Sequence, residues 1–256
     1  MQPTIERFRE VRGRSVALAA PLAVDDLLAQ SMDDVSPTKW HLAHTTWYFE
    51  RFVLARTDGF APVDPRHDFL FNSYYDAVGP RHPRPRRSLI TRPTLDDVWA
   101  YRRAIDAAME RLLEAGVDDE LAFVIEVGLA HEEQHQELIL TDIKHVLGTS
   151  LFQAAYRPAP AESAAASAPG PASAGWRAFA EGIHEIGHDG RGFAFDNEGP
   201  RHRVFLEAFE IAARTITCGE LCEFIADGGY ETPSLWVAEG WARVQAEGWG
   251  APLYWE

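Results

Sequence analysis

Two histidines, His131 and His135, stand four residues apart in the sequence HEEQHQE. In a helix this spacing places both imidazoles on one face, a turn apart, where they can hold one metal ion. Apolar residues flank the pair, with Leu129 before it and the run 138–140 after it. The histidine face is therefore expected to turn inward, although a solvated face with two incidental histidines remains the simple alternative.

A second histidine pair lies earlier in the chain, in the sequence WHLAHTTW. His41 and His44 are one helical turn apart, and either of them could face His131 and His135 across a helix packing. A third imidazole would complete a three-histidine metal site with open coordination positions. A transition metal in such a site can bind substrate and activate water or dioxygen. The alternative is a packed histidine among tryptophans.

The letters HEEQH also match the H-E-x-x-H helix of zinc peptidases, in which the glutamate, here Glu132, acts as general base. The usual continuation is missing, because no G-x-x-H follows and the next histidine is His145. A carboxylate such as Asp142 or Glu162 could serve as third ligand. We rank this hydrolase hypothesis second.

The segment 71–87 adds a third group of functional side chains, FNSYYDAVG followed by PRHPRPRR. Four arginines fall within seven residues of this chain. Arginine binds carboxylates through two parallel hydrogen bonds, so the segment could clamp a small acidic substrate. A solvated basic loop is the alternative. Tyr74 and Tyr75 could donate hydroxyl hydrogen bonds or simply pack.

Helices are predicted around all of these residues. We expect an N-terminal helix from about Thr4 and a second helix after Ser36-Pro37, with Ser36 as N-cap and Pro37 as its first residue. Thr94 and Asp97 resemble a capping box for a helix that stops at Gly116. Asp118 can cap a long helix ending at Gly148. Four helices with apolar stripes pack most simply as a bundle, with one long connection from about Asp58 to Pro93.

Composition divides the chain. Residues 157–175 are Ala, Pro, Ser or Gly at seventeen of nineteen positions, which indicates a linker. We therefore predict a helical domain at 1–156 and a second region at 176–256. Alternating strand patterns occur in the second region, together with a capping box at Thr217 and Glu220. Its C-terminal part is rich in Trp and Gly, and we expect it to be incomplete.

Charge and cysteine content exclude several classes. The 24 basic and 39 acidic residues give a net charge of −15, which is unfavourable for binding nucleic acid. The two cysteines, Cys218 and Cys222, exclude a disulfide scaffold and a four-cysteine zinc site. Neither a targeting segment nor a membrane-spanning apolar run is recognisable, so we expect no membrane association and a cytoplasmic location.

Taken together, WHLAHTTWYFE, FNSYYDAVG, HPRPRR and HEEQHQELILTDIKH resemble, in this order, the non-haem iron sulfoxide synthases of ergothioneine biosynthesis. In that family a DinB-like helical bundle precedes a domain like the formylglycine-generating enzyme, of the C-type-lectin-like α+β class. The stretch 193–236 resembles the opening of this second domain. The resemblance implies oxygen-dependent joining of hercynine (Nα-trimethylhistidine) to the thiol of cysteine or γ-glutamylcysteine, with sulfoxidation.

The resemblance also implies roles for individual residues. It places Fe(2+) on His44, His131 and His135, which leaves His41 as a neighbour. Gln134 would lie by the substrate imidazole, and Arg84 and Arg87 match the arginines that hold the carboxylates of the thiol substrate. The catalytic tyrosine of the family lies beyond Glu256, so we expect a truncated form with little or no synthase activity.

Two further hypotheses remain open. DinB-like bundles with similar histidine faces also act as metal-dependent transferases on low-molecular-weight thiols. A non-catalytic binding module or remnant is the other alternative.

Overall fold

The computed structural model describes residues 2–158 and 175–255, which are mainly helical with a small antiparallel region toward the C-terminal end. The chain divides into two compact units, Met1–Pro160 with His188–Gly199, and Ala161–Gly187 with Pro200–Glu256. Of the predicted linker, residues 159–174 lie outside the described residues.

Four longer helices build the first unit; two of them begin at the caps that the sequence predicts, and the N-terminal one begins directly after Thr4, as expected. The four helices are α1 (Ile5–Ala19), α3 (Thr38–Tyr48), α5 (Leu95–Ala115) and α6 (Asp119–Gly148). Thr4 accepts a hydrogen bond from a backbone N–H in the first turn of α1, and Asp118 does the same for α6. Thr94 forms the expected capping box, and α5 ends before Gly116, which has a φ of 86°.

The start of α3 differs from the prediction by one residue. Pro37, rather than Ser36, occupies the N-cap position, and the helix begins at Thr38. Ser36 does not cap because its polar groups have other partners: its hydroxyl accepts from Arg87 Nη1 at 2.8 Å and its N–H donates to Asp142 Oδ2 at 2.8 Å. The polypeptide continues beyond α3 as a π-helical turn, Phe49–Val53.

The long connection from Asp58 to Pro93 is ordered by short elements and by one buried amide. It contains α4 (His67–Phe71) and two 3-10 segments, Asp76–Val78 and Arg84–Leu89. Another short helix, α2 (Val24–Leu28), lies outside this connection and precedes α3. Asn72 is fully buried and bonds the backbone of Tyr75 and Gly79. These bonds shape the turn without regular secondary structure.

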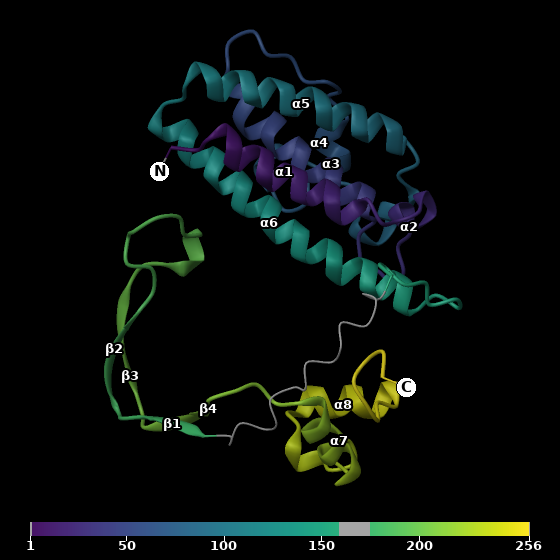
Figure 1. Ribbon diagram of the computed structural model, residues 1–256, viewed down its shortest axis with the longest axis vertical. Helices are drawn as coiled ribbons and strands as arrows, with labels where there is room; N and C mark the ends of the chain where they lie inside the picture. Colours follow the sequence, from purple (N-terminus) through teal and green to yellow (C-terminus); the bar gives the residue numbers. More distant parts are fainter. Residues whose placement is uncertain (1, 159–174, 256) are drawn as a thin grey trace. The chain divides into compact units, whose positions relative to one another are not determined.

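The core of the first unit lies where α3 packs against α5 and α6, and α1 packs against α6 and α5 (Figure 1). Trp47, Phe49 and Leu129 are fully buried in it. Gly128 lets α6 approach the end of α3 closely: a Cβ there would lie 2.6 Å from Tyr48 Cε1 and 2.9 Å from Phe49 Cε1. This close approach occurs one turn before His131, so it sets the helix spacing near the histidines.

A buried ionic network centred on Glu132 of α6 joins all four helices. The Glu132 carboxylate accepts from Arg12 Nη1 of α1 at 2.7 Å and from Arg102 Nη2 of α5 at 2.5 Å. Arg12 also donates to Thr46 Oγ1 of α3 at 2.9 Å, and Ser15 Oγ donates to Glu132 at 2.6 Å. Because the Glu132 carboxylate and both guanidinium groups are paired, the cost of burial is offset and the helix register is fixed.

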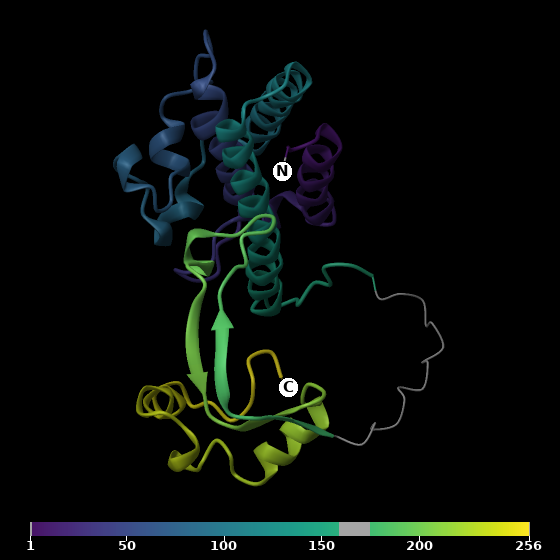
Figure 2. The same cartoon turned by 90° about the vertical axis from the view of Figure 1, so that its left-hand side faces the viewer.

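In its described residues the second unit contains two antiparallel strand pairs and two α-helices. Strand β1 (Trp176–Phe179) pairs with β4 (Phe209–Ala212), and β2 (Gly182–Ile186) pairs with β3 (His202–Leu206). Figure 2 shows β2 and β3 side by side as a long ribbon. Helices α7 (Cys218–Ala226) and α8 (Ala238–Glu247) follow, and the predicted capping box at Thr217 opens α7.

Within residues 175–255, Val244 is the single buried apolar side chain, whereas Trp176, Ile183 and Phe205 are largely exposed. Two-stranded sheets with uncovered apolar side chains are marginally stable by themselves. Among the described helices, none combines the length and apolar character needed to cross a membrane.

Candidate metal centre

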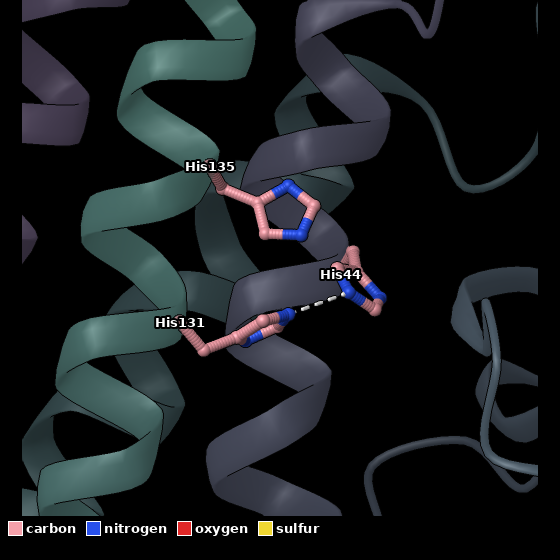
Figure 3. Close-up of side chains that lie close together, drawn as sticks. All are labelled: His44, His131 and His135. Atoms are coloured by element: carbon pink, nitrogen blue, oxygen red, sulfur yellow. Dashed lines mark hydrogen bonds between the residues drawn. The ribbon is translucent and has the colours of Figure 1, made fainter. Parts of the chain in front are cut away.

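Three imidazoles from two helices meet inside the first unit (Figure 3). His44 comes from α3, while His131 and His135 come from successive turns of α6. One nitrogen from each ring lies within 4.8 Å of the others, and the Nε2 atoms of His44 and His131 are 3.1 Å apart. The structure therefore brings together the three histidines that the resemblance implied as ligands.

The orientation of His44 is fixed from outside the cluster. Its Nδ1 lies 2.5 Å from the carbonyl oxygen of Phe71, so Nδ1 carries the proton and Nε2 keeps a lone pair. The ring stacks on Trp40, with centroids 4.5 Å apart and planes inclined by 12°. A metal-binding histidine needs this arrangement, with one nitrogen donating to a backbone carbonyl and the other free for the ion.

Burial keeps all three imidazoles neutral, as metal ligands must be. Burial lowers the pKa of His131 to about 4, and the nearby imidazole of His41 adds to the effect, although the Glu132 charge opposes it. Burial also lowers the pKa values of His44 and His135 well below their ordinary range, and neighbouring histidines add to the effect. Two imidazole nitrogens bound at right angles to one ion at ~2.1 Å would be ~3 Å apart, close to the distance found. The residues fit a divalent metal.

The zinc-peptidase hypothesis is wrong on geometry. Glu132 is fully buried on the face of α6 toward α1 and α5, where Arg12, Arg102 and Ser15 occupy its oxygens. Burial would raise the pKa of this carboxyl, but the two arginines outweigh burial and hold the pKa at about 2. It cannot accept a proton from a metal-bound water. Asp142 does not join the three imidazoles either, because it bonds His41 at 2.9 Å.

Arg87 is buried without a carboxylate partner among the described residues, since its two terminal nitrogens donate to Ser36 Oγ and Ser73 Oγ. Its guanidinium carbon lies 3.3 Å from the centroid of the Trp40 ring, the same ring that stacks on His44. Burial and the charge of Arg84 lower the pKa of Arg87 to about 9. A buried guanidinium that has no salt bridge among the described residues and lies close to the histidines favours a bound anion.

The remaining predicted residues lie closer to solvent. Arg84 is half-buried, with Nη1 3.4 Å from the exposed Tyr74 hydroxyl, and its Nε is buried without a hydrogen-bond partner. Gln134 is exposed on α6, between the two histidines in sequence. Tyr75 packs its ring against Phe52, with centroids 4.7 Å apart, and is part of the core periphery.

Two groups around the imidazoles were not predicted from the sequence, the Phe71 carbonyl and the Ser36 N–H, and Asp142 was predicted as a possible metal ligand rather than as the partner of His41. Asp142 stands seven residues after His135, which places it on the same face of α6. This spacing is a usable signal. Nothing in the sequence indicated the Phe71 carbonyl, because every residue has a backbone carbonyl and its position depends on the fold.

Residues 7–139, slightly more than half of the chain, match the DinB superfamily. This chain belongs to the DinB superfamily. The matched DinB region includes all three histidines of the centre and both Arg84 and Arg87.

Curated relatives extend the similarity beyond the DinB region. The chain is similar to proteins named hercynine oxygenase from Mycolicibacterium smegmatis (29% identity over 228 residues) and Mycobacterium tuberculosis (30% over 227 residues). A third, from Mycolicibacterium thermoresistibile, is 28% identical over 234 residues. Each comparison covers 86% of this chain and 48–50% of the relative. The chain thus spans about half the length of these relatives.

Proposed function

We propose that this DinB-superfamily chain is the metal-binding part of an iron(II)- and O2-dependent sulfoxide synthase that joins hercynine to the thiol of cysteine or γ-glutamylcysteine. The carrying observation is the buried cluster of neutral imidazoles, His44, His131 and His135, in a chain similar to hercynine oxygenases. The neighbouring unpaired arginine supports an acidic substrate.

In this proposal His44, His131 and His135 hold Fe(2+) through one nitrogen each. Three imidazoles leave open positions on the ion for a thiolate, a substrate imidazole and dioxygen, whose reaction the iron makes possible. The protein supplies the fixed ligand geometry. Phe71 holds His44 through its carbonyl, and the buried surroundings keep the ligand nitrogens unprotonated.

Arg87 is assigned to the carboxylate of the thiol substrate, with Arg84 as its outer partner. Arg87 is oriented in advance by Ser36, Ser73 and the Trp40 ring, so little side-chain entropy remains to be lost when an anion binds. Arg84 is more exposed and has fewer bonds. It is suited to a second carboxylate, as γ-glutamylcysteine would present.

Gln134 is assigned to the hercynine side, because it is exposed next to His131 and His135 on α6. The packing of α1, α3, α5 and α6 is taken as a DinB-like four-helix bundle, residues 1–156. Residues 176–256 are assigned to the beginning of a domain like the formylglycine-generating enzyme, with residues 157–175 as the linker.

Oxygen uptake on iron-loaded protein tests this function. The chain is loaded anaerobically with Fe(2+), and hercynine is added with cysteine or with γ-glutamylcysteine before O2 is admitted. Nitric oxide added instead of O2 gives an electron paramagnetic resonance signal that reports the iron environment. The proposal predicts that this signal changes on adding thiol, and that any oxygen uptake requires hercynine and thiol together.

The same samples separate the alternatives. A thiol transferase of the DinB-like type would bind thiol but consume no O2 and form no sulfoxide. Iron whose signal responds to neither hercynine nor thiol would contradict the proposed substrates.

A further inference from the structure

His41 is a buried histidine for which the proposed metal site has no use, yet both of its ring nitrogens are engaged. Nδ1 lies 2.8 Å from Nδ1 of His135, and Nε2 lies 2.9 Å from Oδ2 of Asp142. The ring is 1% exposed. His41 thus stands between a carboxylate and one of the three clustered imidazoles.

Asp142 is itself held in place. The same oxygen that faces His41, Oδ2, accepts the Ser36 N–H at 2.8 Å, and the residue is buried at 8% exposure. His135 and Asp142 lie two turns apart on α6, and His41 and Ser36 come from α3 and the residues before it. Asp142, His41 and His135 thus form a row of hydrogen-bonded side chains. This row links α3 and α6, the two helices that carry the histidine cluster.

The donors and acceptors in this row determine which nitrogens carry protons. An ionised carboxylate only accepts, so His41 must carry its proton on Nε2. A neutral imidazole then has a lone pair on Nδ1, which can only accept from Nδ1–H of His135. His135 is left with a lone pair on Nε2, the nitrogen that Figure 3 shows turned toward His44 and His131.

We propose that His41 and Asp142 are positioning residues that lock His135 in the tautomer and orientation required of a metal ligand. The inference rests on the proposed metal site. Without the row, neutral His135 could place its proton on Nε2, the nitrogen that must be free for the ion. Partners of this kind typically change metal affinity 10–100-fold when removed.

Two leucine variants remove the row and two asparagine variants retain part of it. In His41→Leu, His135 loses the acceptor of its Nδ1–H. In Asp142→Leu, His41 remains but loses the carboxylate that orients it. In His41→Asn the amide oxygen can replace Nδ1 as acceptor, and in Asp142→Asn the amide oxygen can still accept from Ser36 and His41. Gln136→Leu is the matched control, because Gln136 is a buried polar residue of α6 that bonds Val11 and Ser15 instead.

The first readout needs no metal. Long-range nitrogen–proton NMR spectra of the metal-free protein assign the tautomer of each histidine. We expect His135 to carry its proton on Nδ1 in the wild type and in Gln136→Leu, and to populate both tautomers in the two leucine variants. A wild-type His135 protonated mainly on Nε2 would overturn the inference.

The second readout is Co(II) affinity, measured by competition with a chelator, together with the visible ligand-field spectrum. The leucine variants are expected to bind about 10–100-fold more weakly and with an altered spectrum, while the asparagine variants lose less than about tenfold. Unchanged affinity and spectrum in both leucine variants would overturn the positioning role. A wild type that binds no Co(II) would instead refute the proposed metal site, while the NMR result would still test the tautomer lock.

Discussion

Glu132 and Arg102 form a buried ion pair in which Oε1 of the carboxylate lies 2.5 Å from Nη2 of the guanidinium, and the two side chains are 0% and 2% exposed. Glu132 directly follows His131, yet its carboxylate lies on a different face of α6, against α1 and α5. One helix thus has two polar faces. His131 and His135 lie on the face toward α3, and the ionic network on the other face holds the helices together.

Replacing Glu132 by Gln is expected to destabilise the folded protein. Because Glu132 is not a general base, we expect no separate effect on proton transfer. The change leaves Arg102 buried without its carboxylate partner, while Arg12 keeps its salt bridge to Asp106, and the loss costs about 3–5 kcal/mol of unfolding free energy. Chemical denaturation measures this loss of unfolding free energy. Glu133→Gln is the control: its side chain is 37% exposed and pairs with Arg7, so about 0–1 kcal/mol is expected. Equal losses of unfolding free energy in the two variants would contradict the structural role of Glu132.

The same carboxyl group predicts a pH dependence. Its pKa is about 2 in the folded protein against an ordinary value of 4.5, so folding releases a proton between these values. The contribution of Glu132 to stability is full above pH 4.5 and disappears as the pH falls toward 2. The unfolding free energy of the wild type should therefore approach that of Glu132→Gln below pH 4.5. A difference that stays constant from pH 7 to 3 would contradict this.

Gly128→Ala should lower stability although alanine is the better helix former. The new Cβ would clash with the rings of Tyr48 and Phe49, and overpacking of this kind costs about 1–3 kcal/mol. Gly13→Ala in α1 is the control, because its Cβ would meet nothing within 4 Å and helix propensity should stabilise it by about 0.5–1 kcal/mol. Thermal melts compare the two. A Gly128→Ala protein as stable as Gly13→Ala would show that the helices tolerate wider spacing.

Arg87→Lys tests the carboxylate assignment. Lysine keeps a positive charge but cannot reproduce the fork that bonds Ser36 and Ser73 while covering Trp40. Binding of cysteine to the Co(II)-loaded protein should weaken about tenfold or more, since hydrogen bonds to charged groups contribute about 1.5–3 kcal/mol. Cysteamine, which lacks the carboxylate, should bind the variant and the wild type alike. Equal weakening for both thiols would contradict the assignment, and Arg86→Lys, on an exposed position of the same segment, is the control.

Local signals were sufficient to predict most of the helical framework. Thr94, Asp118 and Gly116 mark helix ends through their own side chains or backbone freedom, so their roles are readable from the sequence. Ser36 carried the same signal but not the same role, because Arg87, 51 residues away, binds its hydroxyl. A cap can be recognised locally, whereas a competing tertiary partner cannot.

The metal centre was predictable only in part for the same reason. The spacing of His131 and His135 indicated a shared face, but His41 and His44 are equivalent in a helical pattern. The structure distinguishes them because Asp142 bonds His41 and the Phe71 carbonyl bonds His44. The letters HEEQH were equally ambiguous: the direction of Glu132 depends on Arg12, which lies 120 residues earlier.

Metal stoichiometry after anaerobic loading with Fe(2+) is the direct test of the three-histidine centre. We expect about one ion per chain in the wild type and loss of that ion in each of His44→Ala, His131→Ala and His135→Ala. His184→Ala, at an exposed position of β2, should bind as the wild type does. A wild type without bound iron, or alanine variants that retain it, would contradict the three-histidine centre.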